Sequence, residues 1–176
     1  MSDVSRIAVF PAAAVEHLRR KAKELKKKTG VPHHEALDIV AREIFHLPDW
    51  HHFIEQAKAN ELSERAFKAG LVVGIDVKEA SDVRSSLSQF VRDERLVMFV
   101  RSEFEKAHPK PWSEEVEGDW EDLDWQFVYF RCVRTTPNTL DEVWELCRKD
   151  FFFGPQYVRL KGKVLQDPFS DEDENE

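Results

Sequence analysis

The sequence predicts an α+β fold in which a three-helix module at residues 1–60 precedes a small mixed domain at residues 61–165. Apolar residues recur every three or four positions in the first part, whereas the second part also contains β-branched and aromatic runs typical of strands. The charge changes at the same place: residues 1–60 hold 10 basic and 8 acidic side chains, and residues 61–176 hold 16 and 26. The last segment, 166–176, holds six acidic side chains and predicts a disordered acidic tail.

Three amphipathic helices are expected in the first module. Gly30 is suited to close the first helix, Pro32 precedes the second, and Asp49 is a suitable N-cap for the third. Short connections between such helices allow them to enclose one small core. The residues expected on their buried faces are Val15, Leu18, Ala22 and Leu25 in the first helix, Ala36, Leu37, Val40, Ala41 and Ile44 in the second, and Trp50, Phe53, Ile54 and Ala57 in the third.

About three strands with flanking helices are expected in the second domain. Residues 71–77 are apolar and β-branched, and residues 125–134 are apolar on both faces, as in a central strand. Residues 156–165 alternate and predict a half-solvated edge strand. Thr139 and Glu142 have the spacing of a capping box at the start of a helix. Further helices are expected at residues 61–68 and 94–108, and a long acidic loop at residues 109–124.

The composition restricts the classes of function. No apolar stretch approaches the roughly 20 residues that span a bilayer, so we expect no membrane association. The net charge of −8 argues against a protein that coats nucleic acid. Cys132 and Cys147 fit no metal-binding or redox spacing, so we expect reduced core thiols, a cytoplasmic location and no cofactor.

Residues 25–53 (LKKKTGVPHHEALDIVAREIFHLPDWHHF) contain a recognisable pattern. They resemble a small helical module of uncharacterised proteins from bacterial plasmids and integrative elements, which is also appended to some proteins labelled as glyoxalase-superfamily members. The pattern departs at residues 44–48, where IFHLP replaces the usual glycine-containing turn. The resemblance implies a mobile-element neighbourhood and no particular reaction. The matching residues are Leu25, Lys26, Gly30, His34, Glu35, Ala36, Leu37, Asp38, Ala41, Arg42, Asp49, Trp50 and His51.

Histidines are concentrated near the N-terminus, where six of the seven lie between positions 17 and 52. His34 and Asp38 are four positions apart, which is close to the H-E-x-x-H spacing of zinc enzymes, but no third ligand is spaced convincingly. We therefore interpret the histidines as capping and surface residues and predict no metal ligand. A small metal-dependent enzyme that uses this segment is kept as an alternative.

Residues 19–28 (RRKAKELKKK) form a strongly basic segment with seven positive side chains and one negative. A solvated helix face is the simpler interpretation, but such a helix can contact phosphates, so a DNA- or RNA-binding regulator is an alternative function. The second and third helices suggest a helix-turn-helix, although the would-be recognition helix has no Arg to pair with guanine. The cations that lie away from the apolar face are Arg19, Arg20, Lys23, Lys26 and Lys27.

Residues 112–125 (WSEEVEGDWEDLDW) combine three tryptophans with seven acidic side chains. Trp is enriched at the energetically important positions of protein interfaces, so this segment is the leading candidate for binding another protein. The alternative is that its tryptophans hold the loop against the body of the domain. The residues expected to contact the partner are Trp112, Trp120, Glu114, Glu115 and Asp119.

The leading functional prediction is a non-enzymatic accessory or regulatory protein of a bacterial mobile element or phage. Its acidic surface could occupy the basic groove of a nucleic-acid-processing or defence enzyme and inhibit it. Catalysis has little support, because the sequence contains neither a nucleophile elbow nor a phosphate-binding loop. Asp76, at the end of an apolar strand, is interpreted as a cap for the following turn.

Overall fold

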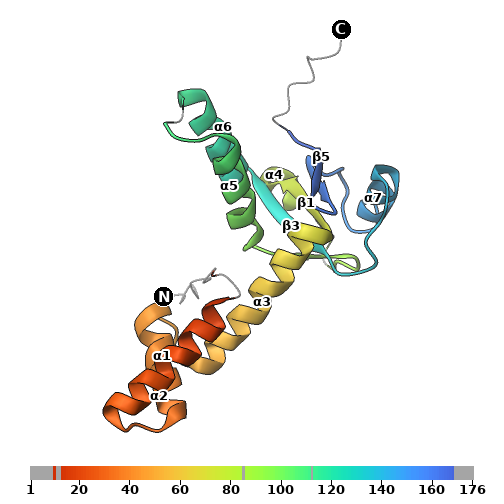
Figure 1. Ribbon diagram of the computed structural model, residues 1–176. Helices are drawn as coiled ribbons and strands as arrows, with labels where there is room; N and C mark the ends of the chain where they lie inside the picture. The colour runs from red at the N-terminus through yellow and green to blue at the C-terminus, as the bar shows by residue number, and fades with distance from the viewer. Residues whose placement is uncertain (1–9, 11–12, 85, 112, 169–176) are drawn as a thin grey trace. The chain divides into compact units, whose positions relative to one another are not determined.

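The structure is a computed structural model (Figure 1) that describes four parts of the chain. The described residues form seven helices and one five-stranded antiparallel sheet, which confirms the α+β class and the helical N-terminal part. The chain divides into two compact units, Met1–Leu62 and Ser63–Glu176. The described parts are residue 10 and residues 13–84, 86–111 and 113–168.

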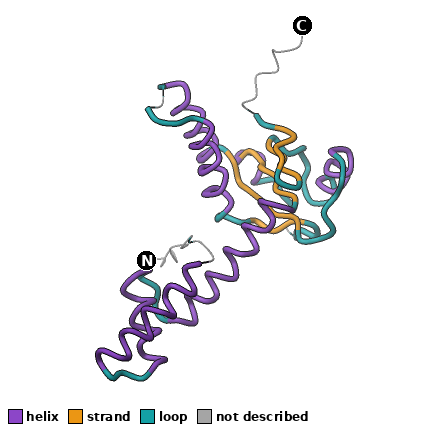
Figure 2. The backbone as a smooth tube through the Cα atoms, in the orientation of Figure 1, coloured by secondary structure: helices purple, strands orange, loops and turns teal. Residues whose placement is uncertain are grey.

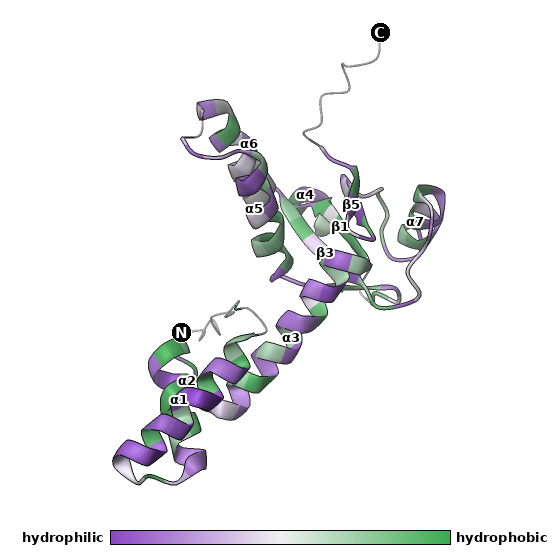
Figure 3. Cartoon of the chain, in the orientation of Figure 1, coloured by the Kyte–Doolittle hydropathy of each residue, from purple (hydrophilic) through white to green (hydrophobic). Residues whose placement is uncertain are grey.

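The first unit holds α1 (Ala13–Thr29), α2 (His33–Phe45) and the first part of α3 (Trp50–Ala69). Hydrophobic and hydrophilic residues alternate along these helices, as the colours of Figure 3 show. Several of the buried residues are alanines, whose small side chains let helices approach each other closely. The buried core consists of Phe10, Ala14, Leu18, Ala22, Ala36, Val40, Ala41, Leu47 and Phe53.

Phe53 lies at the centre of this core. Its fully buried ring is 4.8 Å from the ring of Phe10, 5.3 Å from that of Phe45 and 5.0 Å from that of Trp50. Aromatic pairs at these separations add to the free energy gained by burial. The predicted buried faces of the first and third helices are confirmed, but Ile44, in the last turn of α2, is 38% exposed. Periodicity gives the direction of a side chain and does not show whether a neighbour covers it.

Residues in the left-handed conformation end the first two helices. Gly30 has a φ of 75°, and its N–H donates to the carbonyl of Lys26 at 2.9 Å, which confirms the predicted closing glycine. His46 has a φ of 55°, and its N–H reaches the carbonyls of Ala41 and Arg42. This conformation is uncommon for a residue with a side chain. His46 therefore stands at the turn where the resemblance led us to expect a glycine.

The third helix is longer than predicted. α3 continues through Asn60, whereas the sequence suggested two separate helices and a boundary at this position. Residues 50–69 contain neither Gly nor Pro, so no local signal interrupts the helix, and Asn60 is buried within it. The helix ends where expected, with the N–H of Gly70 donating to the carbonyl of Ala66 at 2.9 Å.

The sheet, whose strands are orange in Figure 2, belongs to the second unit. Its strand order is β2-β3-β1-β4-β5, and every neighbouring pair is antiparallel. The three predicted strand segments correspond to β1, β3 and the β4–β5 hairpin, and β2 is additional. The strands are β1 (Leu71–Asp76), β2 (Phe90–Arg92), β3 (Phe127–Cys132), β4 (Tyr157–Leu160) and β5 (Lys163–Gln166).

Helices cover both faces of this sheet, as Figure 1 shows. Val73 of β1 packs on one face in a cluster that includes α7 (Leu140–Cys147). Val72 packs on the other face with α5 (Leu96–Ala107) and α6 (Glu114–Trp125). Successive side chains of a strand point to opposite faces, so a strand covered on both sides must be apolar throughout. β3 has the same character and is an internal strand, as predicted.

The acidic segment predicted to be a loop at residues 109–124 is largely helical, because α6 begins within it. The hydroxyl of Ser113 accepts the N–H of Val116 at 3.2 Å, and its carbonyl accepts the N–H of Glu117 at 3.0 Å. A serine followed by acidic residues is a favourable helix start, because the hydroxyl caps free N–H groups and the acids lie at the positive end of the helix. This signal outweighs the high charge and the presence of Gly118.

Residues 156–165, predicted to be one edge strand, form the β4–β5 hairpin. Lys161 and Gly162 make its two-residue turn with φ values of 49° and 80°, as a type I′ turn requires. β4 is therefore internal and β5 is the edge strand. As a result Arg159, expected on the solvated side, is buried.

Two predicted helix caps are found in the second unit. Asp76 accepts the N–H of Lys78 at 2.7 Å at the start of α4 (Val77–Ala80). Thr139 accepts the N–H of Glu142 at 3.3 Å at the start of α7. The carboxylate of Glu142 accepts the N–H of Asn138, the residue before Thr139. In a standard capping box it would accept the N–H of Thr139 itself, so this bond is shifted by one residue.

Among the described residues, no helix combines the length and the apolar character needed to cross a membrane. Of the tail predicted at residues 166–176, Gln166 belongs to β5. Residues 169–176 lie outside the described part of the chain.

Candidate functional site

Basic side chains cover the side of α1 that is turned away from the core of the first unit. Leu18 and Ala22 are fully buried on one side of the helix, and the five cations predicted to lie away from them are all exposed. At 3.6 residues per turn, these five cover about 120° of the helix circumference. We call this set the cationic stripe; it consists of Arg19, Arg20, Lys23, Lys26 and Lys27.

Most members of the cationic stripe have no carboxylate partner in the part of the chain that the structure describes. Arg19 lies 2.6 Å from Glu16, one turn earlier in the helix. The other four members form no ion pair with any residue that the structure describes. Like charges three or four residues apart on a helix repel each other, so an anionic ligand along the stripe would relieve this repulsion as well as form contacts.

Part of this charge also stabilises the helix. Lys26, Lys27 and Lys28 lie in the last turn of α1, where cations interact favourably with the partial negative charge of the helix C-terminus. This effect is confined to the last turn, so it does not account for Arg20 and Lys23. Helix stability therefore does not explain why the middle of the cationic stripe, at Arg20 and Lys23, is basic.

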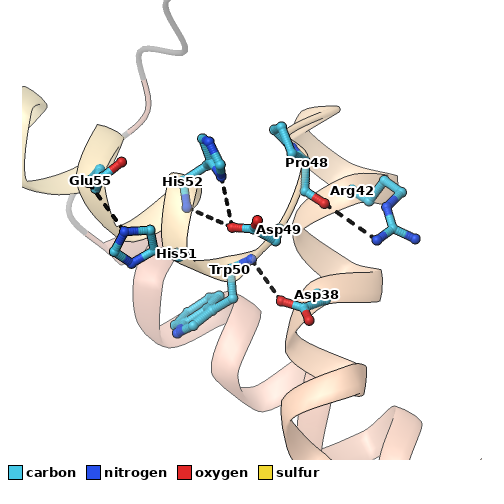
Figure 4. Close-up of polar contacts among 8 residues, drawn as sticks. All are labelled: Asp38, Arg42, Pro48, Asp49, Trp50, His51, His52 and Glu55. Carbon is cyan, nitrogen blue, oxygen red and sulfur yellow. Dashed lines mark hydrogen bonds and ion pairs between the residues drawn. The ribbon is translucent and has the colours of Figure 1, made fainter.

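The joint between α2 and α3 contains much of the recognisable pattern of residues 25–53 (Figure 4). Asp38 accepts the N–H of Trp50 at 2.9 Å, and Asp49 accepts the N–H of His52 at 2.9 Å. The second bond confirms the predicted N-cap. Two free N–H groups at the start of α3 are thus satisfied by carboxylates, which are well placed at the positive end of a helix.

Arg42 closes the same joint from α2. Its guanidinium donates to the carbonyl of Pro48 at 3.4 Å, and the left-handed His46 turns the chain between the two helices. Asp38, Arg42 and Asp49 therefore act as structural residues. The contacts of these three residues join the two helices.

His52 has the most specific partner among the exposed histidines of this segment. Its ring Nδ1 lies 2.9 Å from the Oδ1 atom of Asp49. The hydrogen bond and the charge of that carboxylate raise the pKa of His52, while the backbone and ring of His52 lower the pKa of Asp49. The neighbouring His51 pairs with Glu55 at 3.3 Å instead, so the two rings serve different carboxylates.

The described residues do not gather these histidines into a metal centre, since no group of three or more His, Cys, Asp or Glu in this part of the chain could hold a metal ion. His34 is exposed beside Glu35, whose carboxylate lies 3.9 Å from its ring. Asp38, the second residue of the near-match to H-E-x-x-H, is engaged with the backbone of Trp50. The carboxylate of Asp38 therefore caps the start of α3, although its spacing from His34 is close to that of a zinc-binding motif.

The indole of Trp120 packs against the domain, which is the alternative that the sequence left open for this segment. This side chain is 7% exposed, with the ring of Phe104 at 5.9 Å and the guanidinium of Arg101 at 5.1 Å. An indole that packs against its own chain is not available as an anchor for a partner. Of the other residues expected in that contact, Glu114 is exposed and Asp119 is half-buried, whereas Trp112 and the side chain of Glu115 lie outside the described residues.

Two buried charged residues of the second unit, Asp93 and Arg159, each have an ion-pair partner. Asp93 accepts the hydroxyl of Ser63 at 2.5 Å and the guanidinium of Arg131 at 3.1 Å. Arg159 forms an ion pair with Glu103. Each of these two buried charges is therefore engaged with a partner of opposite charge within the fold.

A small pocket of about 160 Å³ opens beside β3. Ligand pockets are typically about 300 Å³ or larger. The two charged residues at its edge, Arg92 and Glu94, pair with each other at 3.5 Å. The pocket therefore offers no catalytic arrangement; its lining consists of Arg92, Glu94, Val97, Phe127, Val128 and Tyr129.

The exposure of Phe152 and Phe153 was not predicted from the sequence. A run of three phenylalanines suggests core, and Phe151 is indeed buried, but the next two side chains are 66% and 48% exposed. The local sequence does not distinguish these two from Phe151, because Asp150, the charged residue directly before the run, is buried as well.

Comparison of the chain with protein-family models, with curated proteins and with solved structures gives no match. The functional proposals that follow therefore rest on the geometry and the chemistry of the chain itself.

Proposed function

We propose that the chain is a nucleic-acid-binding protein whose cationic stripe contacts the phosphate backbone. The observation that carries this proposal is the exposure of five cations on one side of α1, four of them without an ion-pair partner among the described residues. Leu18 and Ala22 hold another side of the helix in a core, so the charges are presented by a packed element. A surface that is already ordered loses little entropy on binding.

The dimensions of the cationic stripe suit a nucleic-acid backbone. An α-helix rises about 1.5 Å per residue, so the distance along the axis from Arg19 to Lys27 is about 12 Å. Duplex DNA carries one charge per ~1.7 Å of its axis, so several phosphates lie within this length. Lys23 and Lys27 are one turn apart on the same side of the helix and form the expected centre of the contact.

The contacts are expected to involve phosphates rather than base edges. The start of α3, where a helix-turn-helix would present its reading residues, offers His51, His52 and Glu55. Glu55 would repel phosphates, and this part of the helix has no Arg to pair with guanine. Phosphate contacts position a protein without reading sequence, so the binding should show little sequence preference.

The net charge of −8 does not oppose this proposal, because the negative excess belongs to residues 61–176. At physiological ionic strength, exposed charges that are farther apart than about 8 Å are largely screened from each other. Binding through the cationic stripe should therefore depend on its local charge and weaken steeply with added salt.

The acidic segment, the resemblance of residues 25–53 and the two cysteines suggested other properties from the sequence. Trp120 is buried, so it gives less support for a protein contact than the cationic stripe gives for a phosphate contact, and binding of another protein through the acidic segment stays a prediction. An accessory role in a mobile element rests on the resemblance of residues 25–53 alone and stays a prediction. The cytoplasmic location rests on the two cysteines and stays a prediction as well.

Fluorescence anisotropy with a short labelled DNA duplex at low salt tests the proposal. Exchange of Lys23 and Lys27 for Gln should weaken binding by on the order of ten-fold or more, because two phosphate contacts are lost. The matched control, Lys21→Gln with Lys28→Gln, removes the same charge from another side of α1 and should have little effect. Absence of binding by the wild-type chain, or an equal loss in both variants, would overturn the proposal.

A further inference from the structure

Two adjacent phenylalanines are exposed in the loop between α7 and β4. Phe152 is the most exposed large hydrophobic side chain of the described residues, at 66%, and Phe153 is 48% exposed. Phenylalanine is among the residues most often buried in folded proteins, because water contact with its ring is unfavourable. An exposed apolar patch of this kind is typical of a binding site.

Asp150 fixes the loop that carries these rings. Its side chain is almost fully buried and accepts the N–H groups of Ser88 at 2.8 Å, Gln89 at 2.6 Å and Phe90 at 3.1 Å. Burial acts to raise the pKa of Asp150, but the hydrogen bonds from Ser88 and Gln89 outweigh it, so the pKa lies below its ordinary value. The ionised carboxylate thus ties the loop to the residues that lead into β2.

The residues on either side of the exposed pair are packed inward. The ring of Phe151 is buried 5.1 Å from the ring of Phe90 and 5.1 Å from that of Phe130. Gly154 lies so close to the indole of Trp144 that a Cβ atom there would be 1.8 Å from a ring carbon. Both ends of the loop are therefore anchored, and the exposure of Phe152 and Phe153 is a property of its folded conformation.

One basic side chain lies against an exposed ring, and two more precede the rings closely in the chain. The guanidinium of Arg84 lies 5.4 Å from the ring centroid of Phe152 and donates a hydrogen bond to the carbonyl of Lys149. Arg148 and Lys149, at the end of α7, are both exposed. None of these three cations forms an ion pair with a described residue, although residues 61–176 are acidic as a whole. The local charge therefore favours an anionic ligand.

We propose that this surface binds single-stranded nucleic acid, with bases stacked on Phe152 and Phe153 and with phosphates held by Arg84, Arg148 and Lys149. We call these five residues the aromatic platform. Every base has a π face, so stacking on an aromatic ring tolerates any sequence, and neighbouring cations follow the backbone. In a duplex these faces are covered by adjacent base pairs, so the aromatic platform selects unpaired strands.

The aromatic platform is independent of the cationic stripe. It belongs to the second unit and uses stacking as well as charge, whereas the stripe contacts phosphates of duplexes and single strands alike. The loop is ordered before binding, so little conformational entropy is lost when a base stacks. Each surface can be removed without the other, and the two proposals can fail separately.

The test uses the full chain and fluorescence anisotropy with a labelled oligothymidylate and a labelled duplex. Phe152→Leu with Phe153→Leu keeps the apolar character and removes the π faces, so oligothymidylate binding should weaken by on the order of ten-fold or more while duplex binding is unchanged. Phe152→Trp with Phe153→Trp should restore or strengthen binding. Val164→Ser with Leu165→Ser alters another exposed apolar pair and serves as the control that leaves both affinities unchanged.

Three outcomes would overturn the aromatic platform. They are binding of duplex alone by the wild-type chain, an unchanged affinity of the Leu variant for oligothymidylate, and a dimer, detected by light scattering, that Phe152→Ser with Phe153→Ser dissociates. The last result would assign the rings to a second copy of the chain. Loss of duplex binding in the variant with Gln at positions 23 and 27, together with any of these results, would leave the cationic stripe supported and the aromatic platform rejected.

Discussion

Aspartate carboxylates hold the chain at many of its turns by accepting backbone N–H groups. The sequence identifies Asp49 and Asp76 as caps, because their donors lie only two or three residues away. Asp38 bonds to a residue 12 positions later, and Asp150 bonds to Ser88, which is 62 positions earlier. No local pattern signals such bonds, because the partners meet only when the unit has folded.

The pair of Asp49 and His52 should make the start of α3 sensitive to pH. The hydrogen bond to Asp49 raises the pKa of His52 above 6.5. The contribution of His52 to the free energy of unfolding is therefore full below pH 6.5 and is lost as the pH rises through the raised pKa. The pKa of Asp49 is lowered below 3.8, so its contribution is full above that pH and is lost as the pH falls through the lowered pKa.

An NMR titration of the His52 ring measures this coupling directly. The midpoint should lie above 6.5 in the wild-type chain and return toward 6.5 in Asp49→Asn, because the amide carries no charge. The same midpoint in both proteins would contradict the coupling.

The burial of single aromatic side chains is the residue-scale property that the sequence predicts least well. Trp120 stands in an acidic segment and is buried, whereas Phe152 stands in an apolar run and is exposed. Local composition describes a segment, but the element packed against it decides which ring is covered. Phe104 and Arg101 of α5 lie against Trp120, and neither could be identified as its neighbour from the sequence.

Periodicity predicted most helices and strands, and it failed where two elements join. The alternation of residues 156–165 continues through Lys161 and Gly162, so a hairpin appears as one long strand. The two halves of α3 appear as separate helices, because polar residues such as Asn60 interrupt the apolar pattern. In both cases the deciding information is backbone conformation, which a hydrophobic pattern does not contain.

The β4–β5 turn depends on the left-handed backbone conformation of Gly162. Gly162 has a φ of 80°, and an added Cβ would lie 2.7 Å from the carbonyl oxygen of Lys68. Gly162→Ala should therefore destabilise the chain by about 1–3 kcal/mol. Urea unfolding monitored by circular dichroism measures this change.

Gly118 provides the matched control for this substitution. An added Cβ there meets nothing within 4 Å, and the residue lies inside α6. Gly118→Ala should stabilise the chain by about 0.5–1 kcal/mol, because alanine loses less entropy in a helix. Equal midpoints for Gly162→Ala and the wild type would show that the turn conformation is not required.

At the scale of the whole molecule, charge is divided between the two parts of the chain. Residues 1–60 carry a small positive excess, and residues 61–176 carry a negative excess of ten. This division and the position of the cationic stripe could be predicted from the sequence, since both depend on residue types and helical periodicity. The aromatic platform could not, because it is assembled from residue 84 and from residues 148–153 by the fold of the second unit.

The central claim is that phosphates bind along the cationic stripe, and the salt dependence of duplex binding tests it most directly. Each phosphate contact contributes about 0.9 to the slope of log K against log salt concentration for duplex DNA. The slopes of the wild-type chain, of Lys23→Gln with Lys27→Gln, and of Lys21→Gln with Lys28→Gln are to be compared. Removal of Lys23 and Lys27 should make the slope shallower by about 2, whereas the control pair should leave it unchanged. Identical slopes for all three proteins would contradict the claim.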